Sequence, residues 1–174
     1  MAALMTRPGF NRALLHPRHW PMWLGLGVLW LLIQLPYPTI LALGRGAGWL
    51  MLQFMAERRM IARTNLELCF PDWTEDRREQ VLRENFASNG IALFEMAMAW
   101  WWPRKRLYRL ARVDGLEHLQ QAAANGRGVV LMSMHFTTLE IGAALLGQRA
   151  TIDGMYREHA NAAFDFVQRR GREI

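Results

Sequence analysis

The chain has 174 residues, of which 52% are hydrophobic and 21% charged, and 21 Lys and Arg against 15 Asp and Glu give a formal charge of +6. This length suits one domain of ordinary size, and eight Trp, eight Phe and three Tyr exclude an intrinsically disordered chain. The single cysteine, Cys69, excludes a disulfide scaffold. Its apolar neighbours in ELCFP favour a buried, inert thiol over a nucleophile.

Arginine supplies almost all of the positive charge, since Lys105 is the only lysine. A guanidinium binds phosphate or carboxylate through two hydrogen bonds and tolerates apolar surroundings better than an ammonium group. The composition therefore fits a partner that is anionic and partly apolar. The codon usage of a GC-rich genome would produce the same arginine count, so composition alone leaves both explanations open.

The stretch from Trp20 to Gly44 contains no charged side chain. Because about 20 apolar residues span a bilayer, we expect an N-terminal membrane helix here. Pro36 and Pro38 interrupt it, which leaves Pro21 to Leu35 as the strongest helix and a re-entrant or interfacial helix as the alternative. Arginines lie on both sides, so the positive-inside rule assigns no orientation. The basic residues before the stretch are Arg7, Arg12 and Arg18.

The next segment, Gly44 to Thr64, places apolar residues at helical spacing and ends in a group of arginines. This pattern is typical of an amphipathic helix at a membrane surface. Its first residues, GRGAG, are not a phosphate-binding loop, because no strand precedes them and no Lys-Ser/Thr follows. We expect these glycines to allow close helix packing.

Thr74 predicts the start of a further helix. Its side chain suits the N-cap, and Glu75 and Asp76 in the first turn interact favourably with the helix dipole. The helix can run to Pro103, with a break considered near Asn89-Gly90.

A basic cluster follows the three consecutive tryptophans that end this helix. Such a cluster is often only a solvated face, but arginine beside tryptophan is typical of the headgroup boundary of a membrane. We therefore expect the cluster to contact anionic lipid headgroups. Its members are Arg104, Lys105, Arg106, Arg109 and Arg112.

The second half of the chain alternates predicted helices with apolar runs of strand length. Gly128 to Met134 and Thr151 to Tyr156 are predicted strands. Leu116 to Ala124, Leu139 to Leu146 and Ala160 to Arg170 are predicted helices. Strand, helix, strand, helix at this spacing indicates a parallel sheet, so the predicted fold class is α/β.

His135 and Glu140 form an H-x4-E arrangement directly after the first predicted strand. With His135 in a loop and Glu140 in the first turn of the next helix, the carboxylate can fold back to the imidazole. Such a pair orients the ring and raises its basicity, as a general base acting on a hydroxyl requires. A structural histidine is the alternative. Metal binding and a nucleophile elbow are weaker interpretations, because HExxH and GxSxG are absent.

Five stretches carry a resemblance to a known family. They are LLHPRHWPMWLGLGVLWLLIQLPYP, RTNLELCFP, EMAMAWWWP, MHFTTLEIGA and GMYREHANAAFDFVQRRGR. Together they resemble the lipid A biosynthesis lauroyl acyltransferases, within the broader lysophospholipid acyltransferase family, along essentially the whole chain.

The resemblance implies roles for four residues. In that family an H-x4-D/E motif supplies the catalytic base, so His135 would be the base and Glu140 its orienting partner. Arg172, in the Gly-Arg of the last matching stretch, would be the family's functional arginine. Arg157, in the same stretch, would be a second substrate-binding residue. No metal and no organic cofactor is implied.

The resemblance also implies substrates and a location. The donor would be acyl-acyl carrier protein, the transferred chain laurate, and the acceptor a hydroxyl of a Kdo-bearing lipid A precursor. Inner-membrane phospholipid would be a further partner and nucleic acid would not. The protein would lie at the inner membrane of a Gram-negative bacterium, with its catalytic part facing the cytoplasm.

Residues 1–44 would form a basic segment and membrane anchor, and residues 45–174 the start of a glycerolipid-acyltransferase-like α/β domain. Members of the family are longer, so we expect an N-terminal fragment. Two other functions stay open: a glycerophospholipid acyltransferase that uses acyl-CoA, and an inactive, membrane-anchored binding or scaffold protein.

Overall fold

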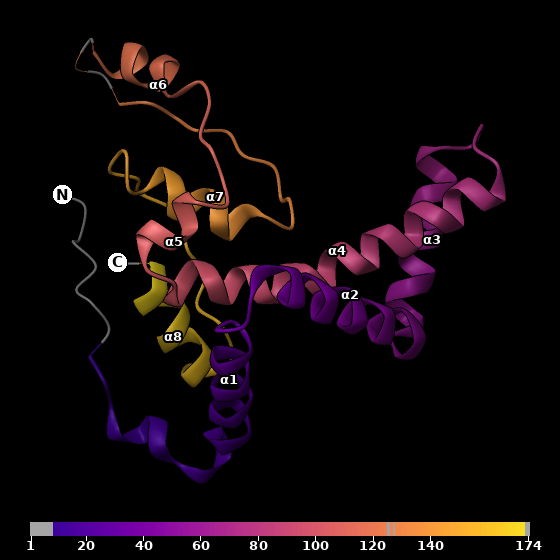
Figure 1. The fold of residues 1–174 in the computed structure, drawn as a ribbon, viewed down its shortest axis with the longest axis horizontal. Helices are drawn as coiled ribbons and strands as arrows, with labels where there is room; N and C mark the ends of the chain where they lie inside the picture. The colour runs from indigo at the N-terminus through magenta and orange to yellow at the C-terminus, as the bar shows by residue number, and fades with distance from the viewer. Residues whose placement is uncertain (1–8, 125, 127, 173–174) are drawn as a thin grey trace. The chain divides into compact units, whose positions relative to one another are not determined.

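The computed structural model describes residues 9–124, 126 and 128–172 (Figure 1). Arg7, expected in the basic N-terminal segment, lies outside them. Short 3-10 helices at Arg12–Leu15 and Pro17–His19 precede the α-helices. These are α1 (Trp20–Leu32), α2 (Tyr37–Phe54), α3 (Ala56–Cys69), α4 (Glu75–Trp101), α5 (Arg104–Tyr108), α6 (Leu116–Ala123), α7 (Leu139–Leu146) and α8 (Ala162–Arg172).

The chain folds into two compact units. One comprises Met1–Met22 and Met98–Ile174, and the other comprises Trp23–Ala97. The first is called the terminal unit below and the second the central unit. The sequence analysis divided the chain differently, into a basic segment and anchor at residues 1–44 and a catalytic domain at residues 45–174. That functional division stays a prediction.

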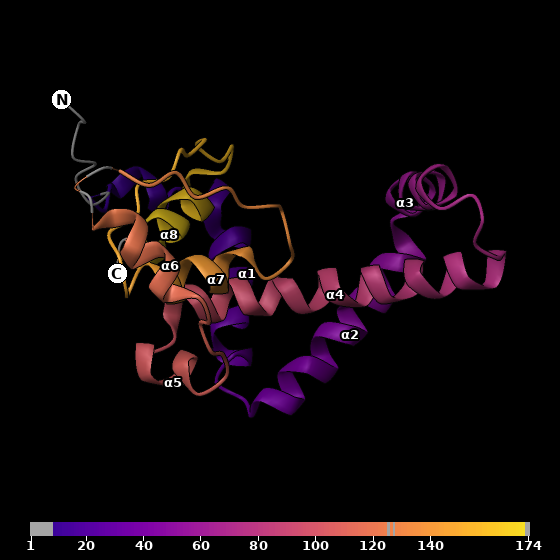
Figure 2. The same ribbon diagram turned by 90° about the horizontal axis from the view of Figure 1, so that it is seen from above.

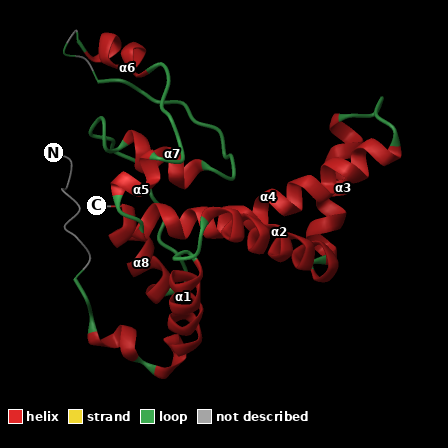
Figure 3. Ribbon diagram, viewed as in Figure 1, coloured by secondary structure: helices red, strands yellow, loops and turns green. Residues whose placement is uncertain are grey.

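The predicted α/β fold is wrong, because the described residues contain helices and loops but no β-strand (Figure 3). Gly128 to Met134 and Thr151 to Tyr156 are irregular. A strand exists only where a neighbouring strand accepts and donates its backbone hydrogen bonds. The first segment has no such neighbour in the described chain, and its side chains Val130 and Met132 are 94% and 98% exposed. An apolar run alone therefore did not make a strand.

The predicted N-terminal membrane helix is also wrong. In the ranges that the structure describes, no helix combines the length and apolar character needed to cross a membrane. α1 has 13 residues, which span about 20 Å, whereas the hydrocarbon core is about 30 Å thick. Pro36 explains the short helix: it has a ψ of 142° and stands at the N-cap of α2, so the chain bends before the next helix begins.

Glycines hold α2 against α4 in the central unit, and Figure 2 shows the two helices crossing. A Cβ built on Gly48 would lie 2.7 Å from the Cα of Ala87, and one on Gly44 would lie 2.7 Å from the Cα of Ile91. From the other side, a Cβ on Gly90 would lie 2.7 Å from the Cα of Gly48. The expectation that GRGAG serves close helix packing is confirmed. α4 continues through Gly90 without the break considered there.

Local helix signals are partly confirmed. The backbone N–H of Arg77 donates to the Oγ1 of Thr74 at 3.3 Å, as an N-cap requires. The helix expected over residues 44–64 instead breaks at Met55, which has a φ of −100° and a ψ of 66°.

The thiol of Cys69 is exposed, which corrects the expectation of a buried one. Glu67, Leu68 and Cys69 in the last turn of α3 are all exposed, so apolar neighbours in the sequence did not bury the thiol.

Candidate functional site

Glu140 is the centre of a polar cluster in the terminal unit. It is the second residue of α7, and its side chain is 18% exposed. Its Oε2 accepts a hydrogen bond from the Nε of Arg172 at 3.2 Å and another from the indole Nε1 of Trp100, also at 3.2 Å. Its Oε1 accepts from the Nη2 of Arg172. Three donors from two other helices therefore fix this carboxylate.

Arg172, the last residue of α8, contacts Glu140. This helix is capped by Asn161, whose Oδ1 accepts from the backbone N–H of Ala163 at 3.0 Å. The guanidinium binds Glu140 through two nitrogens and lies 5.7 Å from the ring centroid of Tyr156. This fork-like pairing is specific to arginine, since a lysine ammonium cannot make it.

Trp100 forms the buried side of the cluster. Its side chain is 1% exposed, and its ring packs edge-on against Phe164 of α8 at 5.5 Å between centroids. A Cβ built on Gly171 would lie 2.5 Å from the Cβ of Trp100, so the end of α8 rests directly on the indole. The tryptophan thus contacts both the carboxylate and the helix end that carries its arginine partner.

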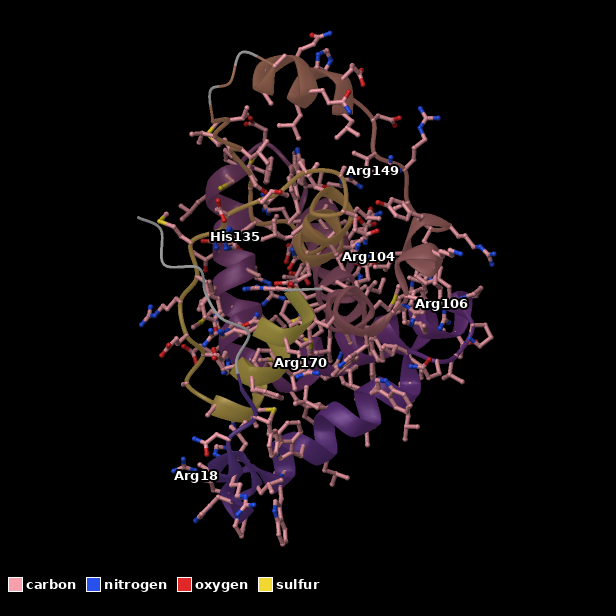
Figure 4. All side chains as sticks on the ribbon, turned by 90° about the vertical axis from the view of Figure 1, so that its left-hand side faces the viewer. Arg18, Arg104, Arg106, His135, Arg149 and Arg170 are labelled. Atoms are coloured by element: carbon pink, nitrogen blue, oxygen red, sulfur yellow. The ribbon has the colours of Figure 1, made fainter. Side chains whose placement is uncertain are left out.

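His135 stands apart from this cluster. It is exposed, on the irregular segment that precedes α7 (Figure 4). No hydrogen bond or ion pair joins it to Glu140 in the described part of the chain. The expected contact between imidazole and carboxylate is therefore not formed in this structure. Glu140 is instead hydrogen-bonded to Arg172 and Trp100.

Arg157 is exposed, and within the described residues it makes no hydrogen bond or ion pair. Its neighbour Tyr156 does: the phenol donates to the Oδ1 of Asp165, which also accepts from the backbone N–H of His159 at 2.7 Å. These bonds hold the segment before α8 against that helix. Of the predicted site residues, the structure thus joins Glu140 with Arg172 and leaves His135 and Arg157 outside.

Sequence reasoning missed Trp100 and Asp165. The only sequence signal for Trp100 was its place in a run of three tryptophans, which does not tell which indole turns inward. No group of three or more His, Cys, Asp or Glu in the described ranges could hold a metal ion.

Two arginines near α5 contact aromatic rings. The guanidinium carbon of Arg106 lies 3.6 Å from the ring centroid of Trp102. Arg149, which follows α7, donates from its Nε to the hydroxyl of Tyr108 at 3.2 Å. Figure 4 labels Arg104, Arg106 and Arg149 in this part of the terminal unit. Stacking on an aromatic ring restricts the orientation of a guanidinium.

Comparisons with known proteins agree with one another. The family described as bacterial lipid A biosynthesis acyltransferase matches residues 7–174. The chain is 48% identical over 165 residues to the lipid A biosynthesis lauroyltransferase of Escherichia coli K12, covering 95% of this chain and 54% of that protein. It is 45% identical over 163 residues to the palmitoleoyltransferase of the same strain, covering 94% of this chain and 53% of that protein.

A lipid A biosynthesis acyltransferase of Haemophilus influenzae is 41% identical over 167 residues, which cover 95% of this chain and 53% of that protein. The chain thus spans about half the length of the curated relatives it matches. No solved structure matches it.

Proposed function

The chain belongs to the bacterial lipid A biosynthesis acyltransferases, and from this premise we propose that its protein transfers a fatty acyl chain to a lipid A precursor. The observation that carries the proposal is the 48% identity to a lauroyltransferase, which extends over 95% of the chain. The proposed donor is acyl-acyl carrier protein. The proposed acceptor is a hydroxyl on a Kdo-bearing lipid A precursor.

The proposed chemistry is direct acyl transfer. His135 accepts the proton of the acceptor hydroxyl while that oxygen attacks the carbonyl carbon of the donor thioester. The tetrahedral intermediate then expels the carrier thiolate, which takes the proton back from the imidazolium. An ester bond forms, a thioester bond breaks, and the histidine returns to its neutral form. An exposed imidazole on the loop before α7 is accessible to a lipid hydroxyl.

Glu140, Arg172 and Arg157 would serve this base and its substrates. Glu140 lies in the first turn of α7, five positions after His135, and is hydrogen-bonded to Arg172 and Trp100. A carboxylate oriented in this way is a suitable partner for the imidazolium that forms during transfer. In this structure Arg172 uses its Nε and Nη2 to bind Glu140. We assign its remaining Nη1, together with the exposed Arg157, to anionic groups of the substrates.

Laurate is the proposed acyl chain. The identity to the lauroyltransferase, 48%, exceeds that to the palmitoleoyltransferase, 45%. Competition between acyl donors of different length is the direct test of this choice.

The proposed location is the cytoplasmic face of the bacterial inner membrane, with inner-membrane phospholipid as a partner. One face of α1 supports it. Leu24, Val28 and Leu31 follow helical spacing and are 71%, 47% and 62% exposed, whereas Leu26 is buried. An exposed apolar helix face fits the interfacial region of a bilayer.

The test uses protein expressed from its complete gene and tetraacyl Kdo-lipid A precursor as acceptor. Mass spectrometry should show addition of one lauroyl group from lauroyl-acyl carrier protein. His135→Ala should lower turnover by about 10²–10⁴-fold, the usual contribution of a general base. Unchanged turnover in that variant would remove the base assignment. Preference for acyl-CoA and a lysophospholipid acceptor would replace the proposed substrates.

A further inference from the structure

We propose that Trp100 is a positioning residue that holds the carboxylate of Glu140 in place beside Arg172. The inference rests on the proposed function, since it gives Trp100 its role through the site carboxylate. It does not require Trp100 to contact a substrate. The three consecutive tryptophans look alike in sequence, and the assignment to Trp100 comes from contacts made across three helices.

The first support is the hydrogen bond itself. An indole N–H can only donate, and a buried donor without an acceptor is costly. The side chain of Trp100 is 1% exposed, so its N–H has no access to bulk water and depends on an acceptor in the protein. That acceptor is the Oε2 of Glu140, at 3.2 Å. The indole thus fixes one oxygen of the carboxylate from the side opposite to solvent.

The second support is the position of Gly171. A Cβ on this residue would lie 2.5 Å from both the Cβ and Cγ of Trp100, so only glycine lets α8 approach the indole this closely. Arg172 is the next residue. The indole therefore also sets the place from which the guanidinium reaches Glu140. All three hydrogen bonds to the carboxylate depend on the placement of Trp100.

The third support is the contrast with the neighbouring tryptophans. The ring of Trp102 is occupied by the guanidinium of Arg106, at 3.6 Å. Trp101 is only half-buried and packs edge-on against Trp100 at 6.0 Å. Neither is bonded to Glu140. Trp101 is therefore a matched control: it is the same residue type at the same helix end, and in the described part of the chain it makes no hydrogen bond to the carboxylate.

The decisive comparison is Trp100→Phe against Trp101→Phe in protein from the complete gene. Phenylalanine keeps an apolar ring but removes the N–H. We expect kcat of Trp100→Phe to fall about 10- to 100-fold, as a displaced catalytic group does, with KM for both substrates changed less than about 3-fold. Trp101→Phe should stay within about 2-fold of the parent. Because positioning acts through Glu140, adding Trp100→Phe to Glu140→Gln should cause no further loss.

A spectroscopic measurement does not depend on activity. In ¹⁵N-labelled protein, Glu140→Gln should shift the indole N–H resonance of Trp100, assigned from its loss in Trp100→Phe, and leave that of Trp101 in place. Parent-like kcat in Trp100→Phe, multiplicative losses in the double variant, or an unmoved indole resonance would overturn the inference. If Glu140→Gln keeps full kcat, the proposed role of Glu140 fails and the role of Trp100 falls with it. If Glu140→Gln loses kcat while Trp100→Phe keeps it, only the role of Trp100 fails.

Discussion

At the scale of single residues, the carboxylate of Glu140 is held by the charge and shape of its partners. Arg172 offers two parallel donors, and Trp100 closes the buried side. The ion pair is not fully exposed, since the side chain of Glu140 is 18% and that of Arg172 41% accessible. Such a pair fixes the orientation of the carboxylate, because a planar guanidinium binds it at two points.

Arg172→Lys should therefore not behave as a conservative change. A lysine ammonium keeps the charge but can hold only one oxygen at a time, so we expect kcat/KM to fall by at least about 10-fold. Arg170→Lys is the matched control, because Arg170 is exposed on the same helix end. Equal kinetics for the two variants would reduce Arg172 to ordinary charge at the end of α8.

Glu95, in the central unit, has a buried carboxyl group. Burial raises its pKa above the ordinary value of 4.5, and the hydrogen bond from the hydroxyl of Tyr37, at 3.5 Å, opposes this by lowering it. Burial is the larger effect. The folded state therefore binds this proton more tightly than the unfolded state does.

The stability of the protein should then depend on pH in a defined direction. The contribution of Glu95 is most favourable below its ordinary pKa and is lost as the pH rises from about 4.5 through the raised pKa of the folded state. Glu95→Gln removes this dependence, so its Tm should exceed that of the parent at pH 7 and approach it at pH 4. Tm curves that stay parallel from pH 4 to pH 8 would contradict the prediction.

At the scale of helices, the crossing of α2 and α4 depends on the absence of side chains. Gly44, Gly48 and Gly90 meet at distances where a Cβ has no room. Gly46 lies between two of them on α2, and a Cβ built on it would have nothing within 4 Å. On α2, a side chain at Gly48 would therefore clash with α4, whereas one at Gly46 would not.

Gly48→Ala should destabilise the protein by about 1–3 kcal/mol or more, because its methyl group would push apart two backbones. Gly46→Ala should stabilise it by about 0.4–1 kcal/mol, since alanine is the better helix former and restricts the unfolded chain. Thermal unfolding of the two variants measures both effects. Loss of stability in Gly46→Ala, or none in Gly48→Ala, would contradict the close crossing.

At the scale of the whole molecule, the proposed membrane location predicts binding to lipid vesicles. Leu24→Glu combined with Leu31→Glu puts two charges on the exposed apolar face of α1. We expect this variant to lose at least about 10-fold in affinity for vesicles of phosphatidylethanolamine and phosphatidylglycerol, because charge at the interface opposes burial of apolar surface. Leu68→Glu, at a side chain 75% exposed on α3, is the control. Co-flotation that is equal for both variants would exclude α1 as the membrane-binding face.

Much of the helical framework could be predicted from local signals. Thr74 capped α4 as expected, and α7 covers Leu139–Leu146, the range predicted from periodicity. Pro36, predicted to interrupt the apolar stretch, is the N-cap of α2, and α1 ends at Leu32, before the predicted end at Leu35. These signals act between residues a few positions apart, through side-chain caps and the fixed geometry of proline.

The family could also be predicted from sequence, and Glu140 and Arg172 could be named as candidate site residues, but their contacts could not be predicted. Trp100 and Arg172 are 40 and 32 positions from Glu140, so only the packing of α4, α7 and α8 brings them together. The same holds for Gly128 to Met134, whose apolar run predicts a strand that needs a distant partner to form. Sequence thus determined the short-range helix starts and ends and the chemistry of the side chains. Tertiary structure alone decided which of those side chains meet, because contacts between residues far apart in the chain depend on how whole helices pack.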